Sequence, residues 1–494
     1  MSSTILFIDD HDILYRSGTQ RVLNSPVRHH TNPLIKSDRP WETAIAWTSA
    51  YRDQHTGKYQ LWYQAFAGDR AIYSTHRCVV CYAESDDGIR FTKPDLNLFN
   101  FNKIKNTNIV LIGNGGHSLR YANSVIIDPR EKDPDRRYKM AYFDFAQDGK
   151  NEHPGLCVAF SPDGIHWTKH PRAPLLKSSY GNYGETVPFD SELDRPWDVP
   201  LSMSDAVDAL YDPRRKVFAL YGKMWIDGPD GGMYWKHGMG RTESKNFVDW
   251  TAPQLLCVPD ELDPSHVEFH TSPVFFYQDV YFCLNQILNR SVRGGVIDIE
   301  LGISRDGINW HRPFKSSFFL SRSDHNQFDS GSIFTNSTPI ILNKEIRFYY
   351  GGYSQGATGA DDYNHVSGVG LAILQRDRFA GLTPVSLSDQ STLKKPLQNT
   401  GQITLKPIML ANCDQISLNA DASHGTVRAE LLDQRGKRVK GFSKDETIPI
   451  RGDSLNHNIK WRDCKLTDLD RRPYLLRLHL DDATVYALTL VAKP

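Results

Sequence analysis

The 494-residue sequence lacks an excess of charge of either sign, because 58 acidic residues balance 58 basic ones. This balance gives no electrostatic reason to expect nucleic acid or an anionic membrane surface as a partner. No apolar run approaches the roughly 18 residues of a transmembrane helix. The amino-terminal stretch has no basic segment before its short apolar core, so it is expected to form a strand rather than a signal peptide. We therefore expect a cytoplasmic protein with no nucleic-acid or membrane partner.

Cysteine patterns and metal-binding motifs are also scarce. Seven cysteines, an odd number scattered along a long chain, favour reduced thiols over a disulfide scaffold. No HExxH motif and no cluster of Cys and His is present, so we predict no metal site and no cofactor. Helical periodicity is almost absent. Aromatic residues are abundant, with 10 Trp, 22 Tyr and 23 Phe, and such side chains build β-sheet cores and stack on sugar rings.

A short motif recurs along the chain. Five times an apolar run ends near a turn of the form SxDGxxW, in "CYAESDDGIRF", "CVAFSPDGIHW", "MGRTESKNFVDW", "LGISRDGINW" and "GLAILQRDRF". An aromatic run with strand character precedes each turn, and a further strand closed by a tight turn precedes each run. Each unit is therefore a strand, a tight turn, a strand, a loop and a third strand.

Five such units predict an all-β fold, with a five-bladed β-propeller over residues 1–385. The strand around "TILFIDD" is expected to complete the closing blade. Residues 386–494 read as a polar linker followed by alternating strands, which predicts a C-terminal β-sandwich. A pair of all-β sandwiches is the alternative fold.

The innermost strands of a propeller converge on its axis, so residues at one end of each strand share a funnel. Acids or polar residues occur near that end of every predicted inner strand. They are Glu42 in the first unit, Arg120 and Asn123 in the second, Asp205 and Asp208 in the third, Glu268 and His270 in the fourth, and His325 and Asp329 in the fifth.

Several carboxylates in one pocket suit the hydrolysis of glycosidic bonds. One carboxylic acid protonates the leaving oxygen, and a second, ionised carboxylate attacks the anomeric carbon or activates water. A third can hold ring hydroxyls and tune the pKa values of its neighbours.

The chain resembles the five-bladed propeller glycosidases of glycoside hydrolase families 32 and 43. The resemblance lies in "NPLI" before Trp41 and Glu42, in the SDGxxW-like turns, in "KEIRFYYGG" and in "HVSGVGLAILQRDRFAGL". It implies a propeller followed by a sandwich, acting on a carbohydrate. The sequence departs from family 32 where Asn123 replaces an expected Asp and where the Glu-Cys motif of blade three is absent. Fructan specificity is therefore not carried over.

We predict Glu42, Asp205 and Glu268 as the catalytic carboxylates, with the order of roles left open. Residues three apart on a strand face opposite sides, so Asp205 and Asp208 should not both face the funnel. Asp205 is preferred, and Asp208 is either a supporting residue or solvent-facing. The predicted substrate contacts are Trp41, Arg120, Asn123, Asp208, His270, His325, Asp329 and His365.

Three other functions remain open. A sialidase-like hydrolase would need an arginine triad, and only Arg120 lies at an inner-strand entrance. A non-catalytic carbohydrate-binding propeller would have no cluster of carboxylates with shifted pKa values. A phosphorylase-type transferase would need a basic anion pocket beside the acid. A structural ion in the funnel and the oligomeric state also remain open.

Overall fold

The computed structural model describes residues 3–114, 121–148, 151–177, 203–226, 228–230, 235–292, 294–315, 317–357, 366–385 and 399–492. In these ranges the regular structure is almost entirely β, and the helical turns are the short 3-10 helices Gly68–Arg70, Ser74–His76, Pro134–Arg136 and Leu466–Asp468. The prediction of an all-β chain is therefore confirmed. Over the same ranges, no helix is long and apolar enough to cross a membrane.

The chain divides into two compact units. One unit comprises Val27–Ile340 and Arg347–Ile373, and it contains every predicted site residue that the structure describes. The other comprises Met1–Pro26, Ile341–Ile346 and Leu374–Pro494. Each unit is described here by itself.

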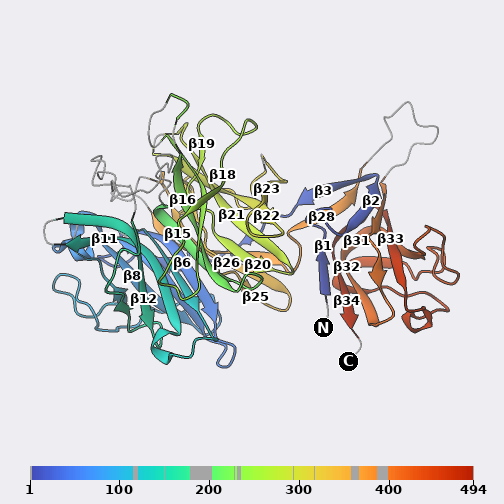
Figure 1. The fold of residues 1–494 in the computed structure, drawn as a ribbon, viewed down its shortest axis with the longest axis horizontal. Helices are drawn as coiled ribbons and strands as arrows, with labels where there is room; N and C mark the ends of the chain where they lie inside the picture. The colour runs from blue at the N-terminus through green and yellow to red at the C-terminus, as the bar shows by residue number, and fades with distance from the viewer. Residues whose placement is uncertain are drawn as a thin grey trace. The chain divides into compact units, whose positions relative to one another are not determined.

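Three antiparallel sheets follow one another along the first unit (Figure 1). The first sheet contains β6 (Ala44–Arg52), β7 (Tyr59–Phe66), β8 (Cys78–Ser85) and β9 (Ile109–Leu111). The second contains β10 (Tyr121–Ile127), β11 (Tyr138–Asp148), β12 (Asn151–Ser161), β13 (Thr168–Lys169) and β14 (Leu176–Lys177). The third contains β15 (Met203–Asp212), β16 (Val217–Ile226), β17 (Lys236–Ser244) and β18 (Gln254–Cys257).

A larger sheet holds two further groups of strands, joined by one parallel pairing of Ile297 with Ser332. The fourth group consists of β19 (Val267–Phe269), β20 (Val274–Tyr277), β21 (Val280–Asn289), β22 (Val296–Ser304) and β23 (Trp310–His311). The fifth consists of β24 (Ser332–Phe334), β25 (Ile340–Ile341), β26 (Glu345–Tyr353), β27 (Ser367–Gln375), and the early strands β4 (Val27–Arg28) and β5 (Ile35–Lys36).

We call the first strand of each group its inner strand. The inner strands are β6, β10, β15, β19 with β20, and β24 with β25. Contacts join β6 to β10, β10 to β15, β15 to β20, and β24 back to β6. Hydrogen bonds accompany these contacts: the Val125 amide donates to Ser49 Oγ at 3.0 Å, and the Ala50 amide donates to Thr338 Oγ1 at 2.9 Å. Side chains at equivalent ends of the inner strands are therefore brought near one another.

The prediction for the amino-terminal strand is wrong. Strand β1 (Ser3–Leu6) pairs with β34 (Thr484–Ala492) in the other unit, where Ile5 lies opposite Leu488. The strands that pair with β27 are β4 and β5, through Val27 opposite Ile373 and Ile35 opposite Val369. A short apolar strand can pair with any free sheet edge, and its sequence does not say which edge it meets.

The second unit is built on a sheet in the order β2-β29-β33-β31-β34-β28-β3, with β1, β30 and β32 paired beside it. These strands are β2 (Ile13–Ser17), β3 (Thr19–Leu23), β28 (Ala380–Pro384), β29 (Thr400–Leu405), β30 (Ile408–Met409), β31 (Cys413–Leu432), β32 (Ile450–Asn458) and β33 (Pro473–Asp481). Its core is a continuous apolar cluster that includes Phe7, Leu418, Leu476 and Leu488.

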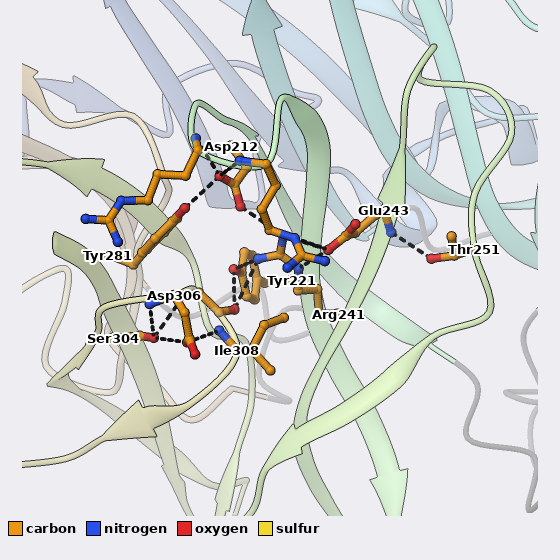
Figure 2. Close-up of polar contacts among 12 residues, drawn as sticks. Asp212, Tyr221, Arg241, Glu243, Thr251, Tyr281, Ser304, Asp306 and Ile308 are labelled. Atoms are coloured by element: carbon orange, nitrogen blue, oxygen red, sulfur yellow. Dashed lines mark hydrogen bonds and ion pairs between the residues drawn. The ribbon is translucent and has the colours of Figure 1, made fainter. Parts of the chain in front are cut away.

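The recurrent turn predicted from sequence has the same hydrogen bonds in three groups and a variant of them in a fourth. In the fourth group the Gly307 amide donates to Ser304 Oγ at 2.9 Å, and the Ile308 amide donates to Asp306 Oδ1 at 2.9 Å (Figure 2). Gly307 has a φ of +74°, which favours glycine. The same contacts recur in the turns that begin at Ser85 and Ser161. In the turn that begins at Ser244, the Asn246 amide donates to Ser244 Oγ at 3.3 Å and the Val248 amide donates to Asn246 Oδ1 at 2.9 Å.

These turns also bind the preceding group. The Tyr221 hydroxyl of the third sheet donates to the Gly307 carbonyl of the fourth group at 2.8 Å (Figure 2). The Trp62 indole of the first sheet donates in the same way to the Gly164 carbonyl of the second at 2.6 Å. Buried Asp212 adds two contacts beside Tyr221. It accepts a hydrogen bond from the Tyr281 hydroxyl at 2.6 Å and forms an ion pair with Arg241 at 3.0 Å. The repeated turn therefore connects successive groups.

Candidate active site

The inner strands are irregular near the end where the site residues were predicted. The pairing of β6 with β7 shifts register between Ile45 and Thr48, that of β10 with β11 shifts between Tyr121 and Ser124, and that of β15 with β16 shifts between Met203 and Val207. The fourth inner strand is divided into β19 and β20, with His270 between them. Such irregularities redirect side chains. The residues in these stretches include Trp47, Asn123, Asp205 and His270.

Three aromatic rings from different inner strands meet at this end. The ring of Trp47 on β6 stacks on that of His270, with centroids 5.8 Å apart and an interplanar angle of 20°. Phe334 on β24 contacts both rings, at 5.0 Å from Trp47 and 5.8 Å from His270. His270 Nδ1 lies 3.0 Å from Gln286 Oε1. His270 was predicted from the sequence to lie near the start of an inner strand, and its ring contacts residues of two other inner strands. Trp47 and Phe334 were not among the predicted site residues.

Asp205 forms a buried ion pair with Lys223 of the neighbouring strand β16. Both side chains are less than a tenth exposed. Burial tends to raise the pKa of Asp205, but the ammonium of Lys223 outweighs it, and the pKa lies below its ordinary value. His270 and His237 also act electrostatically on Asp205. Asp205 is therefore an ionised carboxylate at neutral pH.

Glu268 on β19 accepts two hydrogen bonds from His237, which lies near the start of β17. The backbone amide of His237 lies 3.0 Å from Glu268 Oε2, and His237 Nδ1 lies 2.6 Å from the same oxygen. Arg290 forms an ion pair with the other oxygen, Oε1. Burial opposes ionisation, but the hydrogen bond from His237 and the guanidinium of Arg290 lower the pKa of Glu268 to about 2.

His237 is a buried, neutral imidazole. Burial and the nearby charge of Lys223 lower its pKa to about 4. The ring of Trp225 lies over it, with centroids 3.7 Å apart. Its Nε2 atom is shielded from solvent and has no hydrogen-bond partner among the described residues. Burial and the same lysine lower the pKa of His270 to about 3, so this imidazole is neutral too.

Asn123 is a buried polar side chain near the same end of the inner strands. It is 4% exposed, and neither its amide oxygen nor its amide nitrogen has a hydrogen-bond partner in the described part of the chain. An unsatisfied buried polar group costs about 1–3 kcal/mol. Asn123 and His237 each place an unpartnered polar atom at the irregular end of the inner strands or on a strand next to them, and this region is therefore the candidate site.

Glu42 lies in a different cluster. Its carboxylate accepts from the Tyr63 hydroxyl at 2.7 Å, pairs with Lys93 at 2.6 Å, and accepts from the backbone amides of Asp38 and Arg39 at 3.2 and 3.1 Å. The side chain is fully buried. None of its contacts within the described residues reaches Asp205 or Glu268.

Trp41, predicted as a substrate contact, belongs to the Glu42 cluster. Its side chain is 1% exposed, and its indole donates to Asn108 Oδ1 at 3.2 Å. The Asn108 amide in turn donates to the Tyr63 hydroxyl at 2.7 Å. The indole nitrogen is therefore already bound within the chain.

Asp208 is buried among three inner strands. Its Oδ1 accepts from the hydroxyls of Ser124 and Ser337 at 2.6 Å each, and from the amide of Ala209 at 2.8 Å. Its Oδ2 accepts from the Ser337 amide at 2.9 Å. Burial raises the pKa of Asp208 to about 6. Of the two alternatives left open by the sequence, the structure excludes the solvent-facing one.

His325 and Asp329, the other predicted site residues that the structure describes, make no contact with Asp205, Glu268 or His237 among the described residues. His325 is exposed. Asp329 is fully buried and binds Arg28 at 2.8 Å and the Tyr350 hydroxyl at 2.9 Å. Arg120 and His365 lie outside the described residues.

Three residues of the cluster were missed from sequence: Lys223, His237 and Arg290. Lys223 could have been noticed as a lysine within the apolar and aromatic run "VFALYGKMW". His237 and Arg290 carry no such signal, because both lie at strand ends where polar residues are ordinary. No group of three or more His, Cys, Asp or Glu side chains in the described ranges could hold a metal ion.

No protein-family model and no curated protein matches the chain. Solved structures that the chain is similar to include an N-acetylgalactosamine deacetylase from F. plautii in complex with blood group B trisaccharide. It is 14% identical with a TM-score of 0.45, over 74% of this chain and 97% of that one. A glycosyl hydrolase from Bacteroides ovatus is 16% identical with a TM-score of 0.45, over 74% and 96%.

A third solved structure is described with the GH130 family of mannoside phosphorylases, which contains glycoside hydrolases that target β-1,2 mannosidic linkages in Candida mannan. It is 16% identical with a TM-score of 0.44, over 72% of this chain and 95% of that one. At such identities and TM-scores, these likenesses carry no inference about activity. The function is therefore argued from the side chains of the site.

Proposed function

We propose that the chain is a glycoside hydrolase that cleaves a glycosidic bond of an oligosaccharide or polysaccharide. In this proposal the five groups of strands are the blades of a five-bladed β-propeller within residues 1–385, and residues 386–494 contribute a C-terminal β-sandwich. The contacts that join β6 to β10, β10 to β15, β15 to β20 and β24 back to β6 support the propeller arrangement. The resemblance to families 32 and 43 remains a prediction.

One observation carries the proposal: two ionised carboxylates, Asp205 and Glu268, lie in one buried cluster. His237 binds Glu268 directly and interacts electrostatically with Asp205, so it connects the two. Buried carboxylates with shifted pKa values are typical of catalytic sites. The unpartnered polar atoms of His237 and Asn123 offer hydrogen-bonding positions for sugar hydroxyls or for a water molecule.

The cluster can stabilise positive charge that develops on a sugar ring, because both carboxylates are ionised at neutral pH. Glu42 remains a predicted catalytic carboxylate, although its four donors lie in another cluster. The predicted order of acid, base and nucleophile stays open.

The experiment is a screen of 4-nitrophenyl glycosides and of plant and algal oligosaccharides with the full chain. On a substrate that is cleaved, Asp205→Asn and Glu268→Gln should each lower kcat by about 100-fold or more. Glu42→Gln is measured beside them. If no substrate of the panel is cleaved, or if all three variants keep near-normal kcat, the proposal is wrong.

A phosphorylase-type transferase is the second candidate, and the cations Lys223 and Arg290 beside the carboxylates favour it. Cleavage of the same oligosaccharides with and without inorganic phosphate separates the two. A rate that depends on phosphate, with a sugar phosphate as product, supports the transferase. A rate that phosphate does not change supports the hydrolase.

A further inference from the structure

Glu268 and His237 form a pair whose geometry fixes the position of one proton. Glu268 is ionised, so its Oε2 can only accept a hydrogen bond. His237 Nδ1 lies 2.6 Å from that oxygen and must therefore carry the proton of the neutral ring. The second ring nitrogen, Nε2, is left as a bare acceptor.

The rest of the cluster holds the imidazole in this orientation. The His237 backbone amide binds the same carboxylate oxygen at 3.0 Å, and Arg290 binds the other one. The Trp225 ring packs over the imidazole with centroids 3.7 Å apart. The ring is thus fixed on one edge and one face, while Nε2 has no partner among the described residues.

We propose that His237, oriented by Glu268, is the general base that removes a proton from the attacking water. This inference rests on the proposed hydrolase function and assigns Glu268 the role of a positioning residue. A carboxylate that fixes the tautomer of a histidine base is an arrangement that hydrolytic enzymes use on unrelated folds.

The step balances with an aryl glycoside as substrate. The water oxygen forms a bond to the anomeric carbon while the bond from that carbon to the aryl oxygen breaks. The bonding pair leaves with the aryl oxygen as a phenolate, so no second proton is required. The proton of the water moves to His237 Nε2, and the phenolate takes it from the imidazolium as the products leave.

The test is chemical rescue on the 4-nitrophenyl glycoside that the full-length protein cleaves fastest. His237→Ala should lower kcat by about 100-fold or more, and added imidazole should restore about tenfold of the loss. A residue that only supports the fold would give a loss that imidazole does not reverse. A loss without rescue, in a variant with an unchanged unfolding midpoint, overturns the proposal, as does near-normal kcat.

The matched control is His479→Ala. His479 also pairs with a buried glutamate, its Nε2 lying 3.0 Å from Glu430 Oε1, but both residues belong to the other unit. This variant should keep its kcat, and imidazole should not change it. Loss of activity with rescue in His479→Ala would show that imidazole acts elsewhere and would overturn the inference.

A second measurement does not depend on a substrate. With ¹⁵N-labelled histidine, the His237 signals that disappear in His237→Gln should show a protonated Nδ1 and an unprotonated Nε2 at pH 7. The opposite tautomer overturns the inference about the base, whatever the protein cleaves. If this tautomer is found but no glycoside is cleaved, the proposed hydrolase function fails while the acceptor geometry stands.

Discussion

Glu42 and Glu268 are both buried glutamates beside an inner strand, and each pairs with a cation. The donors to Glu42 are a tyrosine, a lysine and two backbone amides, all of which fix the carboxylate in place. Glu268 is instead bound by a histidine whose other nitrogen has no partner among the described residues. Both glutamates are therefore buried and paired with a cation. Of the two clusters, only that of Glu268 contains a polar atom, His237 Nε2, with no partner among the described residues. That difference distinguishes a carboxylate beside an unpartnered acceptor from one whose donors all fix it in place.

The largest expected effect is on stability at the first cluster. Glu42→Gln leaves Lys93 buried with only the exposed Asp38 carboxylate as an ionic partner. Breaking a buried ion pair in this way should lower the free energy of unfolding by about 3 kcal/mol. Urea unfolding at pH 7 measures it. A loss of kcat in Glu42→Gln with unchanged stability would contradict the comparison and support Glu42 as a catalytic carboxylate.

The second prediction concerns pH. The pKa of His237 is about 4 in the folded chain, whereas a histidine in an unfolded chain has its ordinary pKa of 6.5. The unfolded chain therefore takes up the proton first as the pH falls. The contribution of His237 to the free energy of unfolding should therefore fall by about 3 kcal/mol between about pH 6.5 and pH 4, and it should change little below pH 4.

Urea unfolding at pH 7 and pH 4.5 checks this expectation. His237→Gln should lose less stability than the wild type between these two values. Glu42→Gln is the control, since no histidine binds Glu42 in the described part of the chain, and its loss should equal that of the wild type. Equal losses in the wild type and His237→Gln would show that His237 is not buried as a neutral ring.

The smallest effect is expected at Asp208, which resembles Glu42 in having all its acceptors used. In Asp208→Asn one amide nitrogen must face a donor, either the backbone amide of Ser337 or that of Ala209. The free energy of unfolding should fall by about 2 kcal/mol. Thermal and urea unfolding measure it, and an unchanged midpoint would show that the three inner strands do not converge on this carboxylate.

Parts of this arrangement could be read from the sequence. Hairpin turns such as "YDPRRK" and the strands beside them are local, and the structure pairs Asp212 with Val217 across that turn. Asp205, Glu268 and His270 could be found because they stand at the start of inner strands. Lys223 meets Asp205 within one sheet, at the register shift between β15 and β16, which the sequence pattern did not reveal. His237 lies on a third strand, and its approach to Glu268 depends on how two neighbouring sheets meet. That meeting is a tertiary property that local pattern does not encode.

The irregular pairing of β6, β10 and β15 limits any argument from alternation. Extra residues in one strand break the period of two, so the faces of Trp47, Asn123 and Asp205 do not follow from counting. The edge chosen by the amino-terminal strand is likewise a choice among several unpaired edges. Sequence patterns predict strands well, and they predict the partners of those strands poorly.

The pairing of β27 with β4 and β5 sets an order of events during synthesis. Ile35 and Val369 are partners separated by about 330 residues, which a ribosome adds in roughly 20 to 70 s. Throughout that interval β4 and β5 have no partner strand, because β27 has not yet been made. The fifth group can therefore be completed only when almost the whole first unit has been made, and a ribosome stalled before β27 would hold β4 and β5 without their partner strand.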